Sequence, residues 1–208
     1  MKRNIIKIFG ITLIVVYGLF CPEYAISQKK QLSSTVSADT IGNEAALKKV
    51  NDYTFTDTAG HPVKLSDFRG QWLMVDVWYS GCGGCITANQ GMRTVHDSLA
   101  KEGVLFLSIS IDKSREKWMA SVTPGAKKSK MNPWAGMYVP AVGTVVLYTS
   151  GSGHDNDFRE TFVPKNIYPK LLLFDPQGNL ISDNPPRPDL KPKDLINFIR
   201  EQKRAYSR

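Results

Sequence analysis

A run of apolar residues that leads directly into a closely spaced pair of cysteines constrains the fold of this chain most strongly. Residues 72–78 are apolar except for Asp76, and a polar turn then breaks the pattern. This length and composition predict a strand that is buried on both faces and ends in a turn. Cys82 and Cys85 follow that turn directly.

The residues after the cysteines predict a helix. Ala88, Met92, Val95 and Leu99 recur at intervals of four, three and four residues, which is the spacing of one helical face. The cysteines therefore lie at a strand-to-helix junction. Unpaired N–H groups and the positive dipole end of a helix N-terminus favour the thiolate of Cys82, and a thiolate is the nucleophile in disulfide exchange.

The N-terminal segment predicts export. Lys2 and Arg3 precede an apolar stretch, residues 8–20, which is too short to span a membrane comfortably, and Ala25 and Ser27 supply the small residues of a cleavage site. We therefore expect a signal peptide over residues 1–27 and an exported, periplasmic protein. An uncleaved membrane anchor and a lipid attached at Cys21 are the alternatives, and the membrane is otherwise not an expected partner.

The rest of the chain predicts a tether and one domain. Residues 28–51 are polar and predict a flexible tether with one helical turn near residues 45–50. Residues 52–208 are long enough for a single domain with its own core. Without the signal peptide, Cys82 and Cys85 are the only thiols, so the pair can cycle in an oxidising compartment but no disulfide framework can form.

The pattern before and after the redox strand predicts an α/β domain. Alternating residues over 53–65 predict a hairpin, and Ser66 is expected to cap a short helical turn. Residues 104–111 predict a second buried strand of the βαβ type. Proline and glycine interrupt residues 113–166, which we interpret as an insertion beside the site. The remaining predicted elements are helices at 114–122 and 192–203, and strands at 142–148, 170–174 and 179–181.

Charge and histidine placement favour neither nucleic acid nor metal. The formal net charge of +8 is spread along the chain, and its densest run, residues 127–130, predicts a solvated loop without interleaved aromatic residues. His61, His96 and His154 are scattered without ligand spacing, and no second cysteine pair accompanies them. We therefore expect no nucleic-acid partner and no metal site.

Three separate segments resemble the exported TlpA-like thiol:disulfide oxidoreductases, which have the thioredoxin fold. Residues 55–70 resemble that family's N-terminal hairpin, residues 75–78 with the two cysteines resemble its redox strand and motif, and residues 167–174 resemble its cis-proline strand. The resemblance runs from about residue 52 to the C-terminus. It implies an α/β, thioredoxin-like fold with an N-terminal β-hairpin extension and an insertion before the cis-Pro strand.

The resemblance also implies a reaction. Cys82 would attack the disulfide of a client protein, and Cys85 would resolve the mixed disulfide, so that the two cysteines end as a disulfide. Asp76 would accept the proton of Cys85, because burial raises the pKa of a carboxyl group and makes it a usable base near neutral pH. A hydrogen-bonded structural carboxylate is the alternative for Asp76.

Client binding is expected at a groove around the cysteines. The resemblance assigns it Trp78, Gly83, Gly84, Tyr168 and Pro169, and it alone implies that Pro169 is cis. An ordinary core position is the alternative for Trp78. The expected partners are disulfide-containing client proteins and a membrane-bound dithiol donor, and no cofactor is expected.

Four positions depart from the family. Gly84 stands where the family usually has proline, and Ala88 and Gln90 replace an acidic residue and a proline after the second cysteine. Ser108 stands where thioredoxin has the lysine that partners its buried aspartate. These changes leave the cysteine chemistry intact but alter residues that tune the redox potential.

Two other functions fit parts of the sequence. Peroxiredoxins share the fold, and Ser80 stands two residues before Cys82, although the proline expected upstream in a peroxidase motif is missing. In a non-catalytic client-binding protein, the groove and the insertion would hold a client while the cysteines stayed as a disulfide.

Overall fold

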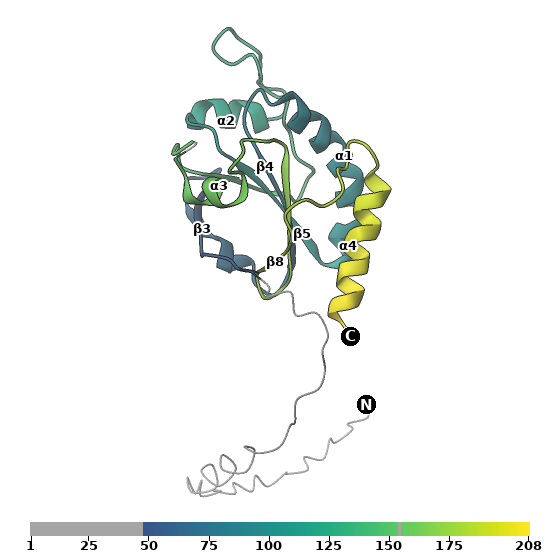
Figure 1. Ribbon diagram of the computed structural model, residues 1–208. Helices are drawn as coiled ribbons and strands as arrows, with labels where there is room; N and C mark the ends of the chain where they lie inside the picture. The colour runs from purple at the N-terminus through teal and green to yellow at the C-terminus, as the bar shows by residue number, and fades with distance from the viewer. Residues whose placement is uncertain (1–47, 154) are drawn as a thin grey trace, which may run out of the picture. The chain divides into compact units, whose positions relative to one another are not determined.

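One mixed sheet of eight strands organises the part of the chain that the structure describes, residues 48–153 and 155–208 of a computed structural model (Figure 1). The strand order is β1-β8-β7-β4-β5-β6-β2-β3. The predicted signal peptide, the alternative lipidation site at Cys21, most of the predicted tether and His154 lie outside the described residues. The strands are β1 (Lys48–Lys49), β2 (Thr54–Asp57), β3 (Pro62–Lys64), β4 (Trp72–Trp78), β5 (Val104–Ser110), β6 (Val145–Tyr148), β7 (Lys170–Phe174) and β8 (Asn179–Ser182).

Strand β4 is the centre of the sheet. All seven of its residues are buried, and it pairs with β5 in parallel and with β7 antiparallel. Strands β5 and β6 are also parallel, whereas the remaining pairs are antiparallel. A strand with neighbours on both sides and cover on both faces needs apolar side chains in both directions, which explains the nearly continuous apolar run.

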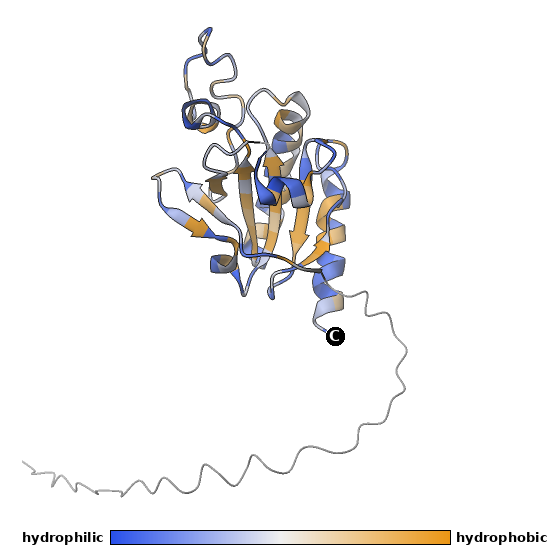
Figure 2. Cartoon of the chain, turned by 60° about the vertical axis from the view of Figure 1, so that its left-hand side comes forward, coloured by the Kyte–Doolittle hydropathy of each residue, from blue (hydrophilic) through white to orange (hydrophobic). Residues whose placement is uncertain are grey.

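The helices cover both faces of the sheet. On one face, Met74 of β4 packs in a cluster with residues of α1 and α4, which lie together in Figure 1. On the other face, Val75 and Val77 pack in a cluster with Phe158 of α3. Figure 2 shows the hydrophobic residues concentrated along the central strands. The helices are α1 (Gly83–Leu99), α2 (Arg115–Val122), α3 (Asp157–Phe162) and α4 (Pro192–Tyr206), with short 3₁₀ segments η2 (Leu65–Phe68) and η3 (Ala100–Glu102).

The main elements predicted from sequence are confirmed. The four residues of the predicted α1 face are all buried, and the predicted hairpin is β2 and β3, which pair antiparallel. The insertion before the cis-proline strand is also present, and Lys127, Lys128 and Lys130 are exposed on it as expected. The strand predicted over 142–148 begins only at Val145, because Val142 is 96% exposed and outside the sheet.

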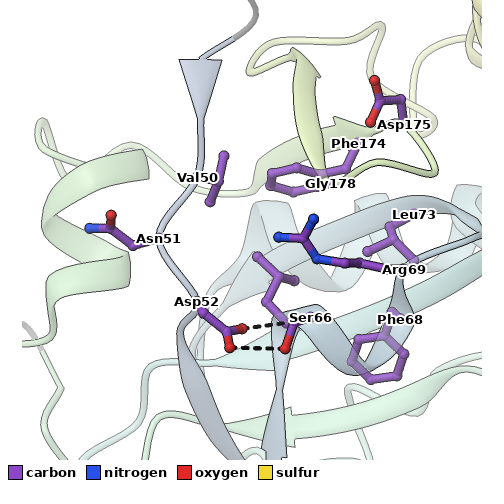
Figure 3. Close-up of a pocket in the computed structure, with 11 residues that line it drawn as sticks. Val50, Asn51, Asp52, Ser66, Phe68, Arg69, Leu73, Phe174, Asp175 and Gly178 are labelled. Carbon is purple, nitrogen blue, oxygen red and sulfur yellow. Dashed lines mark hydrogen bonds between the residues drawn. The ribbon is translucent and has the colours of Figure 1, made fainter. Parts of the chain in front are cut away.

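Two predictions at the start of the domain are wrong. Lys48 and Lys49 form strand β1 on the free edge of β8 instead of a helical turn, because β8 offers unpaired backbone groups there. Ser66 does not cap η2, which begins at Leu65. Its N–H and its hydroxyl each donate a 2.9 Å hydrogen bond to the Asp52 carboxylate, in a small pocket near the N-terminal end of β4 (Figure 3).

Helix α3 was not predicted, and it changes the interpretation of residues 113–166. Phe158 and Phe162 lie four residues apart and are buried, and Phe158 meets Phe55 edge to face with ring centroids 5.1 Å apart. Asn156 caps the helix by accepting from two backbone N–H groups. This part of the segment therefore covers the sheet face away from α1, and only the part before β6 is an insertion beside the cysteines.

Candidate functional site

The turn between β4 and α1 presents the two cysteines. Gly81 has a φ of +95°, which favours glycine, and a side chain there would also meet the Trp134 indole at 2.8 Å. Cys82 is the N-cap of α1, and its Sγ accepts a hydrogen bond from the Cys85 N–H at 3.1 Å. The first cysteine sulfur therefore lies at the positive end of the helix, where a thiolate is stabilised.

Asp112, just after β5, fixes this turn. Its carboxylate accepts from the Ser80 N–H at 3.0 Å and from the Ser80 hydroxyl at 2.8 Å. Ser110 donates a third hydrogen bond at 2.7 Å. The Ser80 hydroxyl is therefore engaged with Asp112 and does not serve Cys82 as a peroxidase motif would require. Nothing in the local sequence pattern pointed to Asp112.

The two cysteines form a disulfide with Cα atoms 5.2 Å apart. They differ in exposure, because Cys82 keeps 5% of its accessible surface whereas Cys85 keeps none. Trp78, Trp118 and Tyr138 pack in the same cluster as the pair. Of the two cysteines, the one at the helix N-terminus is therefore the one that keeps accessible surface.

Gly83 and Gly84 leave the first turn of α1 uncovered. Both are exposed, and a Cβ added at Gly84 would lie 3.4 Å from Pro169 Cδ and 3.7 Å from the Tyr168 carbonyl oxygen. The Tyr168–Pro169 peptide bond is cis, as the resemblance implied. Tyr168 in turn meets Tyr79 edge to face at 5.2 Å. The structure therefore brings together four of the five residues expected to bind a client.

The fifth residue, Trp78, is a correction. Its side chain is fully buried, so it cannot contact a client directly. Its indole donates a 2.8 Å hydrogen bond to the Ser108 hydroxyl, and it stacks on the Tyr138 ring at a centroid distance of 3.6 Å. Trp78 belongs to the core behind the cysteines because its strand is buried on both faces.

Asp76 is buried on the same side of β4 as Trp78. Alternate residues of a strand share a face, so Asp76 lies between Met74, which packs with α1, and Trp78, which packs with the cysteines. Its Oδ2 accepts a short hydrogen bond from the Tyr138 hydroxyl, and its Oδ1 has no hydrogen-bond donor among the described residues. Burial raises the pKa of Asp76 from 3.8 to about 7, and the Tyr138 hydrogen bond lowers it in part.

Tyr138 was not predicted. It comes from the insertion, 62 residues along the chain from Asp76, and it is 2% exposed. Ser108 lies beside Asp76 in the parallel pairing of β4 and β5, where thioredoxin has a lysine. A neutral phenol and a serine hydroxyl therefore take the place of that charged partner. The irregular sequence around Tyr138 carried no signal of this contact.

A pocket opens beside Tyr79, three residues before Cys82. Tyr79, Tyr168, Asp112, Lys113 and Asn166 are among the residues that line it. Within the described residues, no group of three or more histidine, cysteine or acidic side chains is placed to hold a metal ion. None of the helices described at 48–153 and 155–208 combines the length and apolar character needed to cross a bilayer.

The fold and the site define a thioredoxin-like protein with a Cys-x-x-Cys disulfide at the N-terminus of its first long helix. The chain matches the AhpC/TSA family over residues 46–182 and belongs to that family. The resemblance drawn from the three sequence segments is thus confirmed at the level of fold and family.

The curated relative and the solved structures agree with this assignment. The chain is 30% identical to the thiol-disulfide oxidoreductase ResA of Geobacillus kaustophilus (strain HTA426) over 60 residues, which are 29% of this chain and 34% of that relative. The aligned part therefore spans about a third of the relative's length.

Two solved structures illustrate the shared fold. A thiol-disulfide oxidoreductase from Bacteroides fragilis NCTC 9343 is 18% identical, with a TM-score of 0.56 over 74% of this chain and 99% of that one. The thioredoxin domain of a thiol-disulfide oxidoreductase from Bacteroides vulgatus is 20% identical, with a TM-score of 0.54 over 76% of this chain and 98% of that one. At these identities the similarity shows the fold.

Proposed function

We propose that this protein is an extracytoplasmic thiol:disulfide oxidoreductase that reduces or isomerises disulfides in client proteins. The observation that carries the proposal is the Cys82–Cys85 disulfide at the N-terminus of α1, where Gly84 lies against cis-Pro169, together with the buried carboxylate of Asp76 in the preceding strand. The names of the relatives support the same reaction class.

In the first step, the Cys82 thiolate attacks one sulfur of a client's disulfide. A bond forms between Cys82 and the client, the client's own S–S bond breaks, and its second sulfur leaves as a thiolate. Cys82 suits this step because its sulfur lies at the helix N-terminus and because the residue, unlike Cys85, retains accessible surface.

In the second step, Cys85 releases the client. Its thiol passes a proton to Asp76 through water, and the resulting thiolate attacks Cys82 Sγ. The Cys82–Cys85 disulfide forms while the first client sulfur leaves as a thiolate. The client gains two electrons and the cysteine pair loses two, so a dithiol donor must reduce the pair before the next cycle. We assign that role to a membrane-bound dithiol.

The client's backbone would bind beside cis-Pro169. Gly83 and Gly84 carry no side chain over the first turn of α1, and Tyr168 and Tyr79 border the neighbouring pocket. An extended client segment can therefore approach Cys82 along the edge formed by the cis-proline loop. Export through the signal peptide at residues 1–27 would place this reaction in the periplasm, free or attached to the membrane.

A turnover assay tests the proposal. The protein is mixed with a disulfide-bonded peptide and dithiothreitol, and peptide thiols are followed over time. Wild type is expected to turn over, whereas Cys82→Ser and Cys85→Ser are expected to lose turnover. In a second mixture without dithiothreitol, prereduced Cys85→Ser should accumulate mixed disulfides with the peptide that vanish on reduction, and Cys82→Ser should trap little, because Cys85 has no accessible surface.

The alternatives give different results. Peptide binding without turnover would favour a non-catalytic client-binding protein, and consumption of hydrogen peroxide without disulfide reduction would favour a peroxidase. The reduction potential separates directions of electron flow, since a value near about −270 mV favours a reductase and one near about −120 mV favours an oxidant.

A further inference from the structure

The insertion segment that carries Tyr138 is held between two helices. The Gly136 N–H donates to the Ala120 carbonyl at 2.8 Å, and the Tyr138 N–H donates to the Ser121 carbonyl at 3.1 Å, both near the end of α2. From the other side, Asn89 and Arg93 of α1 donate to the Val139 carbonyl at 3.0 and 2.6 Å. Four hydrogen bonds from two helices therefore fix the backbone on each side of Tyr138.

The side chain of Tyr138 is fixed as well. Its ring lies parallel to the Trp78 indole within 8°, at a centroid distance of 3.6 Å. The indole is itself oriented by its hydrogen bond to Ser108. Burial and the neighbouring carboxylate of Asp76 raise the pKa of Tyr138 well above its usual value, so its hydroxyl remains a donor throughout the neutral range.

The two oxygens of Asp76 differ in their hydrogen bonding. Oδ2 accepts from Tyr138, whereas Oδ1 is buried without a donor among the described residues. The carboxylate therefore cannot rotate freely, because rotation would break its one hydrogen bond. A buried acceptor without a partner is costly in a structural residue but is what a proton acceptor requires.

We propose that Tyr138 is a positioning residue of the redox site: its hydroxyl fixes Oδ2 of Asp76 and leaves Oδ1 to accept the proton of Cys85. This inference rests on the proposed function, since it assigns a part in the second exchange step. The insertion thereby supplies the partner of the buried aspartate that Ser108 does not.

The neighbours of Asp76 limit what else could titrate there. The adjacent strands place Ser108 of β5 and Leu171 of β7 beside it, and α1 contributes Cys85 to the same side of the sheet. Of these groups and Tyr138, only the phenol and the thiol ionise. In the oxidised protein Cys85 does not titrate, so among these described neighbours Tyr138 is the one titratable group beside Asp76.

A packing role and a positioning role for Tyr138 are separable. Packing requires the ring stacked on Trp78, whereas positioning requires the hydroxyl. Tyr138→Phe keeps the ring and removes the hydroxyl. Tyr148→Phe is the matched control, because Tyr148 is also a buried tyrosine of this cluster but stacks on Trp118.

Two readouts test the inference. The first is the titration of the Asp76 carboxyl in the oxidised protein, followed by carboxylate infrared absorption against Asp76→Asn. The second is the pH profile of the resolution of a preformed Cys82 mixed disulfide. In Tyr138→Phe we expect both to move to higher pH by about one unit or more, because a hydrogen bond to the charged form is lost. The resolution rate should recover at alkaline pH, and Tyr148→Phe should leave both unchanged.

The outcomes distinguish the inference from the function on which it rests. A carboxyl titration that stays in place in Tyr138→Phe overturns the role of Tyr138. A titration that moves while the rate profile stays in place overturns the role of Asp76 in exchange, and with it the catalytic part of the inference. Loss of rate at every pH, without recovery, also overturns the inference, because it indicates a packing role.

Discussion

Two buried aspartates near the disulfide have opposite surroundings. Asp112 accepts hydrogen bonds from the Ser80 N–H, the Ser80 hydroxyl and the Ser110 hydroxyl, all within 3.1 Å. Asp76 accepts from Tyr138 alone, and burial raises its pKa to about 7. The same side chain is therefore a fixed support where donors surround it, and we propose that it is a proton acceptor where they do not.

The position of each aspartate matches its surroundings. Asp112 follows β5 and accepts hydrogen bonds from Ser80, two residues before Cys82, so it fixes the turn that presents the proposed nucleophile. Asp76 lies inside β4, behind the helix turn that carries Cys85. We infer that Asp112 contributes mainly to stability and that Asp76 contributes to the reaction at some cost in stability.

Replacing Asp112 should have the largest effect on stability. Asp112→Ala should lower the free energy of unfolding by about 3 kcal/mol, because it leaves buried donors of Ser80 and Ser110 without their charged acceptor. Urea unfolding of the oxidised protein measures the change. Asp97→Ala, on the exposed side of α1, is the control and should stay within about 0.5 kcal/mol of wild type. A loss below about 1 kcal/mol for Asp112→Ala would remove the distinction between the two aspartates.

Asp76→Asn should raise the free energy of unfolding at alkaline pH, whereas Asp112→Ala should lower it. The folded state raises the pKa of Asp76 from 3.8 to about 7, so folding favours its protonated form and wild type loses stability as pH rises through this window. The asparagine variant does not titrate there. Its stability relative to wild type should therefore increase by about 2 to 3 kcal/mol between pH 5 and pH 8.

Urea unfolding of the oxidised proteins at several pH values measures this difference, since the disulfide keeps both cysteines from titrating. Parallel curves for wild type and Asp76→Asn across that range would show that burial does not perturb Asp76, and its assignment as a base would fail.

Replacing Ser110 tests how much one hydrogen-bond donor contributes to the effect of Asp112 on stability. Ser110→Ala removes one of the donors to Asp112 but leaves both groups of Ser80 in place. We expect a loss of about 1 kcal/mol in the free energy of unfolding, clearly less than for Asp112→Ala. Equal losses in the two variants would mean that the Ser110 hydrogen bond alone accounts for the stability that Asp112 contributes. The hydrogen bonds from Ser80 to Asp112 would then contribute little.

The comparison also shows how far sequence reasoning reaches. Strand β4, the cysteine motif and the buried face of α1 were predictable because their signals are local: an apolar run and a helical spacing. Asp76 stood out for the same reason, as one carboxyl group in an apolar strand. The environment of each aspartate was not predictable, because its partners come from distant segments.

The misses have the same physical origin. Tyr138 lies in an irregular segment, and only the packing of α1 and α2 on both sides brings it to Asp76. Strand β1 forms because β8 has a free edge to pair with, and no feature of residues 45–50 themselves predicts a strand. Helix α3 did leave a signal, since Asn156 precedes two phenylalanines spaced four residues apart, but the helix has only six residues between preceding glycines and a following proline.

The most direct test of the central claim is the rate at which Cys85 resolves a mixed disulfide on Cys82, measured for wild type and Asp76→Asn between pH 6 and 8. If Asp76 is the base, the wild-type rate should rise as its carboxyl group ionises near pH 7, and Asp76→Asn should be slower by about 10²-fold at pH 8. A variant that resolves the mixed disulfide as fast as wild type across this range would contradict the account and leave Asp76 a structural carboxylate.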